Sequence, residues 1–124
     1  MTEFVDYNIA KQLKEIGFDE ECLGCFDEQR VFGFTIRSIQ KYYKNSKEDT
    51  YSIAVPTYYQ VFQWFRTKHK LHSTITWTST GYDYNIKVEP TRIINVTHIH
   101  SEYRDAEIAC IEYMIKLIKD GSDN

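Results

Sequence analysis

The sequence predicts an α+β domain in which helices pack on one face of an antiparallel sheet. Apolar residues recur at helical spacing in three segments, alternate with polar residues in others, and short turn signals join neighbouring strands. The predicted order is helix, two strands, helix, three strands, helix, and such local connections favour an antiparallel sheet covered by helices. A chain of 124 residues can bury one core, so we expect a single domain over residues 1–124.

The first helix is expected to end at Ile16. Ile9 and Leu13 precede this residue at helical spacing, and Gly17 follows it as a C-cap glycine. The start of the helix is left open among three possible caps, which are Thr2, Asp6 and Asn8.

The segment after this helix predicts a two-stranded hairpin and then an irregular excursion. Residues 22–26 and 31–37 flank the polar residues 27–30, which form a four-residue turn. Residues 38–52 then carry charge without apolar periodicity. We expect an exposed excursion at about 38–52, with residues 42–50 as its most mobile part.

The second helix is expected to open at Pro56, with Thr57 as its cap. Its apolar face is predicted to comprise Tyr58, Val61, Phe62, Phe65 and His69. Trp64 and Tyr59 lie on opposite flanks of this face, so at least one of the two rings is expected to remain exposed.

Three strands and a helix are predicted to follow. A turn at Thr80-Gly81 would pair Ser79 with Tyr82, Trp77 with Tyr84 and Ile75 with Ile86, with Trp77 on the core side of the sheet. The third strand spans 92–100, and its side chains Ile94, Val96, His98 and His100 share one side. The last helix spans about 103–119, and Gly121 ends it.

Charge limits the class of partner. The formal net charge is −3, whereas nucleic-acid-binding domains usually carry a basic face. Residues 57–119 follow the element order of a double-stranded-RNA-binding domain, a family that grips phosphate with lysines at the start of its last helix. Here the corresponding residues 101–107 are acidic and would repel phosphate, so we expect no nucleic-acid partner.

Hydropathy and cysteine usage indicate a cytoplasmic protein. The longest apolar runs are interrupted by charges and fall short of the eighteen or so residues that a membrane helix needs. The acidic start of the chain differs from a signal peptide. Three cysteines are an odd number, which argues against a disulfide framework. We therefore expect a cytoplasmic protein that does not bind membranes.

Two cysteines and two histidines define an alternative function, a small-ligand or zinc-binding domain. Cys22 and Cys25 form a CxxC, and His98 and His100 point to one side of a strand, so the four could complete a tetrahedral zinc site. The competing interpretation is that these are ordinary core cysteines and half-buried strand histidines. Our leading expectation is that the protein uses no cofactor.

A basic cluster near the end of the second helix suggests a contact for a protein partner. It comprises Arg66, Lys68, His69, Lys70 and His72. Cations at a helix C-terminus are also favoured by the helix dipole, which explains the cluster without a partner. Because exposed aromatic residues beside arginine are typical of interfaces, the candidate partner-binding residues are Tyr59, Trp64, Arg66 and Lys68.

Catalytic motifs are missing from the sequence. It contains no glycine-rich phosphate loop, no nucleophile elbow and no His-Glu pair on a helix. Cys110 lies on the apolar face of the last helix, where a core thiol is expected rather than a nucleophile. No catalytic residue is therefore assigned, and a minor hydrolase or nuclease is the least favoured class.

Three stretches of the chain carry a family resemblance: LKEIGFDEEC at 13–22, VPTYYQVFQWFR at 55–66 and AEIACI at 106–111. Together they resemble a group of small uncharacterised proteins encoded by phages, prophages and mobile elements of Bacteroidetes-type gut bacteria. In that group the position of Cys25 is usually aromatic, and the excursion around Asn45 is shorter or absent. The resemblance implies an origin but no activity.

These observations give one leading hypothesis. The protein is expected to be a non-enzymatic accessory protein of phage or mobile-element type that binds another macromolecule. The partner would be a protein, either encoded by the host or a second copy of the chain.

Overall fold

The computed structural model describes residues 3–34, 42–47 and 51–121. The chain divides into two compact units, Met1–Gln60 and Val61–Asn124. The α+β class and the predicted element order are confirmed: the described residues form three helices and two three-stranded antiparallel sheets. None of these helices combines the length and the apolar composition needed to cross a membrane.

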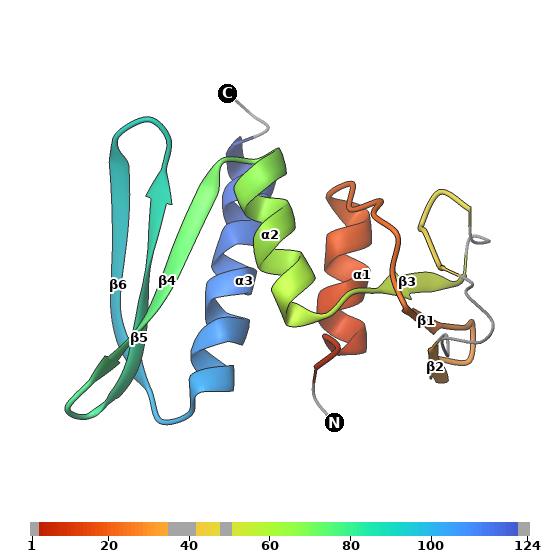
Figure 1. Cartoon of the computed structure of the whole chain (residues 1–124), viewed down its shortest axis with the longest axis horizontal. Helices are drawn as coiled ribbons and strands as arrows, with labels where there is room; N and C mark the ends of the chain where they lie inside the picture. Colours follow the sequence, from red (N-terminus) through yellow and green to blue (C-terminus); the bar gives the residue numbers. More distant parts are fainter. Residues whose placement is uncertain (1–2, 35–41, 48–50, 122–124) are drawn as a thin grey trace. The chain divides into compact units, whose positions relative to one another are not determined.

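The first unit contains one helix and the smaller sheet (Figure 1). Its elements are α1 (Tyr7–Glu15), β1 (Gly24–Phe26), β2 (Phe32–Phe34) and β3 (Ile53–Val55), followed by the start of α2 (Tyr58–Lys68). Asp6 caps α1, because its carboxylate accepts a hydrogen bond from the Ile9 N–H. At the other end Gly17 adopts a φ of 96° and the Phe18 N–H donates to the Leu13 carbonyl, which confirms the predicted glycine stop.

The sheet of the first unit has the order β2-β1-β3. The predicted hairpin is confirmed in its core, with Cys25 opposite Gly33 and Phe26 opposite Phe32. Residues 35–37 of the expected second strand lie outside the described residues. Strand β3, which pairs with β1 on its other side, was not predicted from the sequence. All three of its side chains are buried, so it lacks the alternation by which a half-buried strand is recognised.

Part of the predicted excursion is attached to the first unit. Cys22 and Tyr43 exchange backbone hydrogen bonds of 2.7 and 2.8 Å. The Asn45 side chain donates to the Phe18 carbonyl and accepts from the Ala54 N–H. Residues 43–45 are consequently half-buried rather than exposed. Residues 42, 46 and 47 are exposed, and residues 48–50 of the predicted mobile stretch lie outside the described residues, as do 35–41.

Helix α2 begins where it was predicted to begin, because the Thr57 hydroxyl caps it by accepting from the Gln60 N–H. Its buried face, however, is rotated from the predicted one. Tyr58, Val61, Trp64 and Phe65 are buried, whereas Phe62 is only half-buried. Tyr59 is 74% exposed, which confirms that one of the two flanking rings remains at the surface.

The second unit holds the larger sheet and α3 (Tyr103–Gly121), which runs along one sheet face (Figure 1). The strands are β4 (Leu71–Thr78), β5 (Gly81–Val88) and β6 (Arg92–His100), paired in that order. The buried side chains of β4, β5 and α3 include Leu71, Tyr84, Ile86, Ala106, Cys110, Ile111, Met114 and Ile115.

The predicted β4–β5 register is wrong by two residues. Trp77 lies opposite Tyr82, and Ile75 lies opposite Tyr84. The hairpin closes at the pair Thr78 and Gly81, because the Thr78 hydroxyl accepts from the Thr80 N–H and donates to the Gly81 carbonyl. This local bonding makes Ser79-Thr80 the two-residue loop.

Candidate functional site

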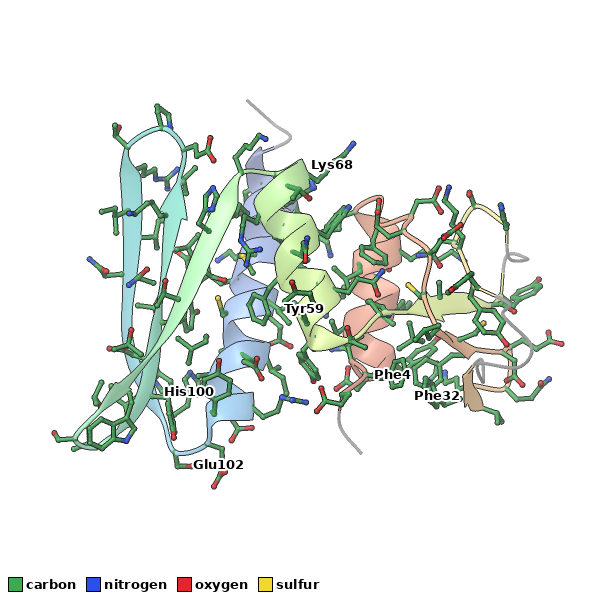
Figure 2. All side chains as sticks on the ribbon, in the orientation of Figure 1. Phe4, Phe32, Tyr59, Lys68, His100 and Glu102 are labelled. Carbon is green, nitrogen blue, oxygen red and sulfur yellow. The ribbon has the colours of Figure 1, made fainter. Side chains whose placement is uncertain are left out.

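Five ring-bearing side chains lie around the end of the larger sheet that precedes α3. We name this set the aromatic surface; it comprises Trp77, Tyr82, His98, His100 and Tyr103. All five belong to the second unit. Figure 2 labels His100, together with Glu102 in the short connection to α3.

Backbone pairing and ring contacts place the members of the aromatic surface side by side. Tyr82 lies between Trp77 on β4 and His100 on β6 in the register of the sheet. Its ring meets the Tyr103 ring edge to face, with centroids 5.6 Å apart, and the His98 and His100 rings are 4.7 Å apart. Edge-to-face contacts of this kind orient aromatic rings relative to one another.

Exposure distinguishes this surface from the core. Trp77 was expected to be buried on the core side; it lies on that face of the sheet, opposite Tyr82, but it is 71% exposed, so the expected burial is wrong. Tyr103 is 49% exposed, while Tyr82 and His100 are half-buried. Tyr84 and Ile86, farther along β5, are buried and form part of the core. The same sheet face therefore changes from core to surface along the strands.

Strand β6 contains a bulge near this end of the sheet, where its pairing with β5 shifts register. Between the pairs Tyr84–Val96 and Tyr82–His100, β5 advances two residues and β6 advances four. The backbone of β6 also comes close to Gly81, where a Cβ atom would lie 2.5 Å from the His100 carbonyl oxygen. Only glycine fits at this position, which has a φ of 151°.

The charged side chains near the aromatic surface in sequence are mainly acidic. Glu102 and Asp105 flank Tyr103 and are exposed, and Asp83 follows Tyr82 and is half-buried. The nearby Arg104 is paired with Glu107 at 2.7 Å. Partial burial, and next the Glu107 carboxylate, raise the pKa of the Tyr103 phenol, which therefore remains a neutral hydrogen-bond donor at neutral pH.

The four predicted partner-binding residues do not all reach the surface. Tyr59, Arg66 and Lys68 are exposed on α2, and Figure 2 labels the first and the last. Trp64 is only 5% exposed, so its assignment as a partner contact is wrong. Its ring packs against Phe65 and His69 at centroid distances of 5.1 and 4.8 Å.

Two histidines of the predicted basic cluster have local structural roles. Burial, followed by the charge of Lys68, lowers the pKa of His69. His72 lies 2.6 Å from the Glu89 carboxylate. The exposed cations of the cluster are therefore Arg66, Lys68 and Lys70.

The predicted zinc ligands have different surroundings. Cys22 is buried, its thiol faces the Glu20 carbonyl, and burial raises its pKa to about 12. Cys25 is half-buried, His98 is exposed and His100 is half-buried. In the part of the chain that the structure describes, no three His, Cys, Asp or Glu side chains gather as a metal site would require. A thiol with a raised pKa is also a poor source of the thiolate that binds zinc.

Sequence reasoning missed the aromatic surface because it placed Trp77 in the core. The available signals were the ten tyrosines and two tryptophans of the sequence, more than a core of this size needs. Comparison with protein-family models, curated proteins and solved structures gives no match to this chain.

Proposed function

We propose that this protein is a non-enzymatic accessory protein that binds another protein through the aromatic surface. The observation that carries the proposal is the 71% exposure of Trp77 beside Tyr82 and Tyr103. Tryptophan and tyrosine are among the residues that contribute most to binding energy at protein interfaces. Leaving such a ring in water forgoes the favourable free energy of burial, which a partner would supply.

The charges near the aromatic surface support a partner that presents lysine or arginine side chains. Glu102 and Asp105, which lie close to Tyr103 in the sequence, give the adjoining residues a negative balance. Cationic groups are attracted both to these carboxylates and to the faces of aromatic rings. The same acidic residues disfavour a nucleic-acid partner, because they repel phosphate.

The resemblance of residues 13–22, 55–66 and 106–111 to proteins of phages and mobile elements supports a role in such an element. Under this proposal the protein works in the cytoplasm of the bacterial host. Its partner is a host protein or a second copy of the chain.

The proposal is tested by quantitative capture from a lysate of a Bacteroidetes-type gut bacterium, together with sedimentation of the purified chain. We expect Trp77→Ala to weaken capture of the partner, or self-association, by more than about tenfold. Binding should also weaken at high salt, because exposed charges are screened.

Ile93→Ala is the matched control. Ile93 is an exposed apolar residue on β6 of the same sheet and lies outside the aromatic surface. The Ile93→Ala variant should capture as much partner as the wild type does. Equal capture by the wild type and Trp77→Ala would contradict the proposed surface. A wild-type chain that captures no partner and stays monomeric would contradict the proposed function.

A further inference from the structure

A second candidate site is formed by residues of the first unit, none of which belongs to the aromatic surface. It is a hollow of about 390 Å³, lined by one side of α1, the turn between β1 and β2, and the start of β3. Pockets for small organic ligands usually have volumes of about 300–1,000 Å³. The hollow is therefore large enough for a ligand of modest size.

Helix α1 supplies one wall of the hollow. Tyr7, Lys11 and Lys14 are spaced by four and three residues, which places them on one side of the helix. The opposite side carries Ile9 and Leu13, which are buried. Because Ile9 and Leu13 anchor α1 in the core, the side chains of Tyr7, Lys11 and Lys14 are directed towards the hollow.

The turn between β1 and β2 positions Arg30 on the other wall. The Asp27 carboxylate accepts from the Gln29 and Val31 N–H groups, and the Asp27 carbonyl accepts from the Arg30 N–H. Arg30 itself has a φ of 63°, a left-handed conformation that these bonds hold in place. Its guanidinium carbon lies 4.4 Å from the centre of the Tyr7 ring.

The Tyr7 ring supports the Arg30 guanidinium group by a cation–π contact, which uses none of its N–H donors. These donors can bind a carboxylate or phosphate in bidentate fashion. Nearby, the Lys14 ammonium group donates to the Ser52 carbonyl at 2.9 Å, which ties α1 to the residue that precedes β3.

The residues that line the hollow have a net positive formal charge, although the protein as a whole is acidic. Three cations, Lys11, Lys14 and Arg30, face two carboxylates, Glu15 and Glu28, although the whole chain has a formal charge of −3. A concave surface with an excess of one charge attracts ligands of the opposite charge. The hollow is also bordered by Tyr51, whose side chain is 68% exposed and offers a ring for stacking.

We propose that this hollow binds a small organic anion in which a phosphate or carboxylate is joined to an aromatic ring. Arg30 and Lys11 bind the anionic group, and Tyr51 contacts the ring. Lys14 and Tyr7 are positioning residues, because the former ties α1 to Ser52 and the latter supports the guanidinium group. This ligand site is independent of the proposed protein-binding function.

Four probes separate the parts of the ligand. AMP carries a ring and a phosphate, 4-hydroxybenzoate carries a ring and a carboxylate, adenosine lacks the anion, and inorganic phosphate lacks the ring. In calorimetry and amide NMR titrations up to about 1 mM, we expect AMP or 4-hydroxybenzoate to bind at one site and to shift amides of α1 and the β1–β2 turn. Adenosine and inorganic phosphate should bind at least about tenfold more weakly.

Two substitutions locate the site without relying on a single variant. Arg30→Asn removes the charge but keeps a residue that tolerates positive φ, and Lys11→Gln changes an exposed position of α1. Each should weaken binding by about tenfold, the effect of losing one bond to a charged group. The control Lys87→Gln removes an exposed cation from β5 in the second unit and should leave binding unchanged.

The outcomes distinguish this site from the aromatic surface. Trp77→Ala should bind AMP or 4-hydroxybenzoate as the wild type does. The proposal is overturned if neither compound binds, or if binding is unchanged in folded Arg30→Asn and Lys11→Gln variants. It is also overturned if adenosine binds as tightly as AMP and 4-hydroxybenzoate does not bind.

Discussion

The Trp64 indole meets the His69 imidazole edge to face, with ring centroids 4.8 Å apart and planes inclined by 79°. The two rings join the end of α2 to the residue that follows it. Phe65 packs against the same imidazole at 6.0 Å. The contact gives Trp64 a role in the core, and it places a titratable group beside two apolar rings.

Trp64→Ala should strongly destabilise the protein. Removing a buried tryptophan side chain typically costs about 3–5 kcal/mol through lost burial and the cavity left behind. Tyr59→Ala, on an exposed position of the same helix, should change the free energy of unfolding by less than about 0.5 kcal/mol. Urea unfolding followed by circular dichroism measures both, and equal effects of the two substitutions would contradict the assigned burial.

His69 should make the protein less stable in mild acid. Burial lowers its folded-state pKa below the ordinary value of 6.5, so the unfolded chain takes up a proton more readily. The contribution of neutral His69 is therefore fully present above pH 6.5 and is lost as the pH falls through that value towards the folded-state pKa. Comparing unfolding at about pH 7.5 and about pH 5.5 should show a smaller pH effect in His69→Gln than in the wild type. An identical pH effect in both proteins would exclude His69 as its source.

Gly81→Ala should destabilise the hairpin of the second unit. The new Cβ atom would lie 2.5 Å from the His100 carbonyl oxygen, and a φ of 151° is unfavourable for alanine. We expect a loss of more than about 1 kcal/mol in the free energy of unfolding. Gly33→Ala is the control, because no atom lies within 4 Å of its Cβ position. If the two variants unfold at the same urea concentration, the close approach is not maintained in solution.

Cys25 should be the first cysteine to react with a thiol reagent. Burial raises the pKa values of Cys22 and Cys110 to about 12, so both remain protonated and covered at about pH 8. Cys25 is half-buried and more accessible. Titration with a disulfide reagent should therefore show one fast thiol in the native protein and three after denaturation. Cys25→Ser should remove the fast phase, and its persistence would assign the reaction to a different cysteine.

Asn45→Ala should destabilise the first unit, because the Asn45 side chain bonds both Phe18 and Ala54. The loss of these part-buried bonds should cost about 1–3 kcal/mol. Asn45→Asp keeps the acceptor for the Ala54 N–H but cannot donate to the Phe18 carbonyl, so its loss should be intermediate. The control is Asn8→Ala, at an exposed position of α1, which should not reduce the free energy of unfolding. If Asn8→Ala destabilised the protein as much as Asn45→Ala, the effect would not be specific to the hydrogen bonds of Asn45.

Local signals in the sequence were sufficient to predict most elements. Gly17 ends α1 and Thr57 caps α2 because these signals act within a few residues of their own position. The strand β3 was missed because a fully buried strand of three residues has neither alternation nor length to identify it.

The candidate site was less predictable, because burial depends on which parts of the chain cover a face. Periodicity located the apolar arc of α2 but not which edge of it is buried, so it left open whether Trp64 or Tyr59 is the exposed ring. Alternation placed Trp77 on the correct face of β4, but it could not show that the strand end is uncovered. The hollow involves residues of α1, the β1–β2 turn and β3, whose proximity no local pattern reveals.

The register of the β4–β5 hairpin limits which changes of loop length the second unit can tolerate. Lengthening or shortening the Ser79-Thr80 loop by two residues exchanges cross-strand partners but keeps every side chain on its own face. A change of one residue that no β-bulge absorbs would instead turn Tyr84 and Ile86 away from α3 and bring the polar face of β5 against the core.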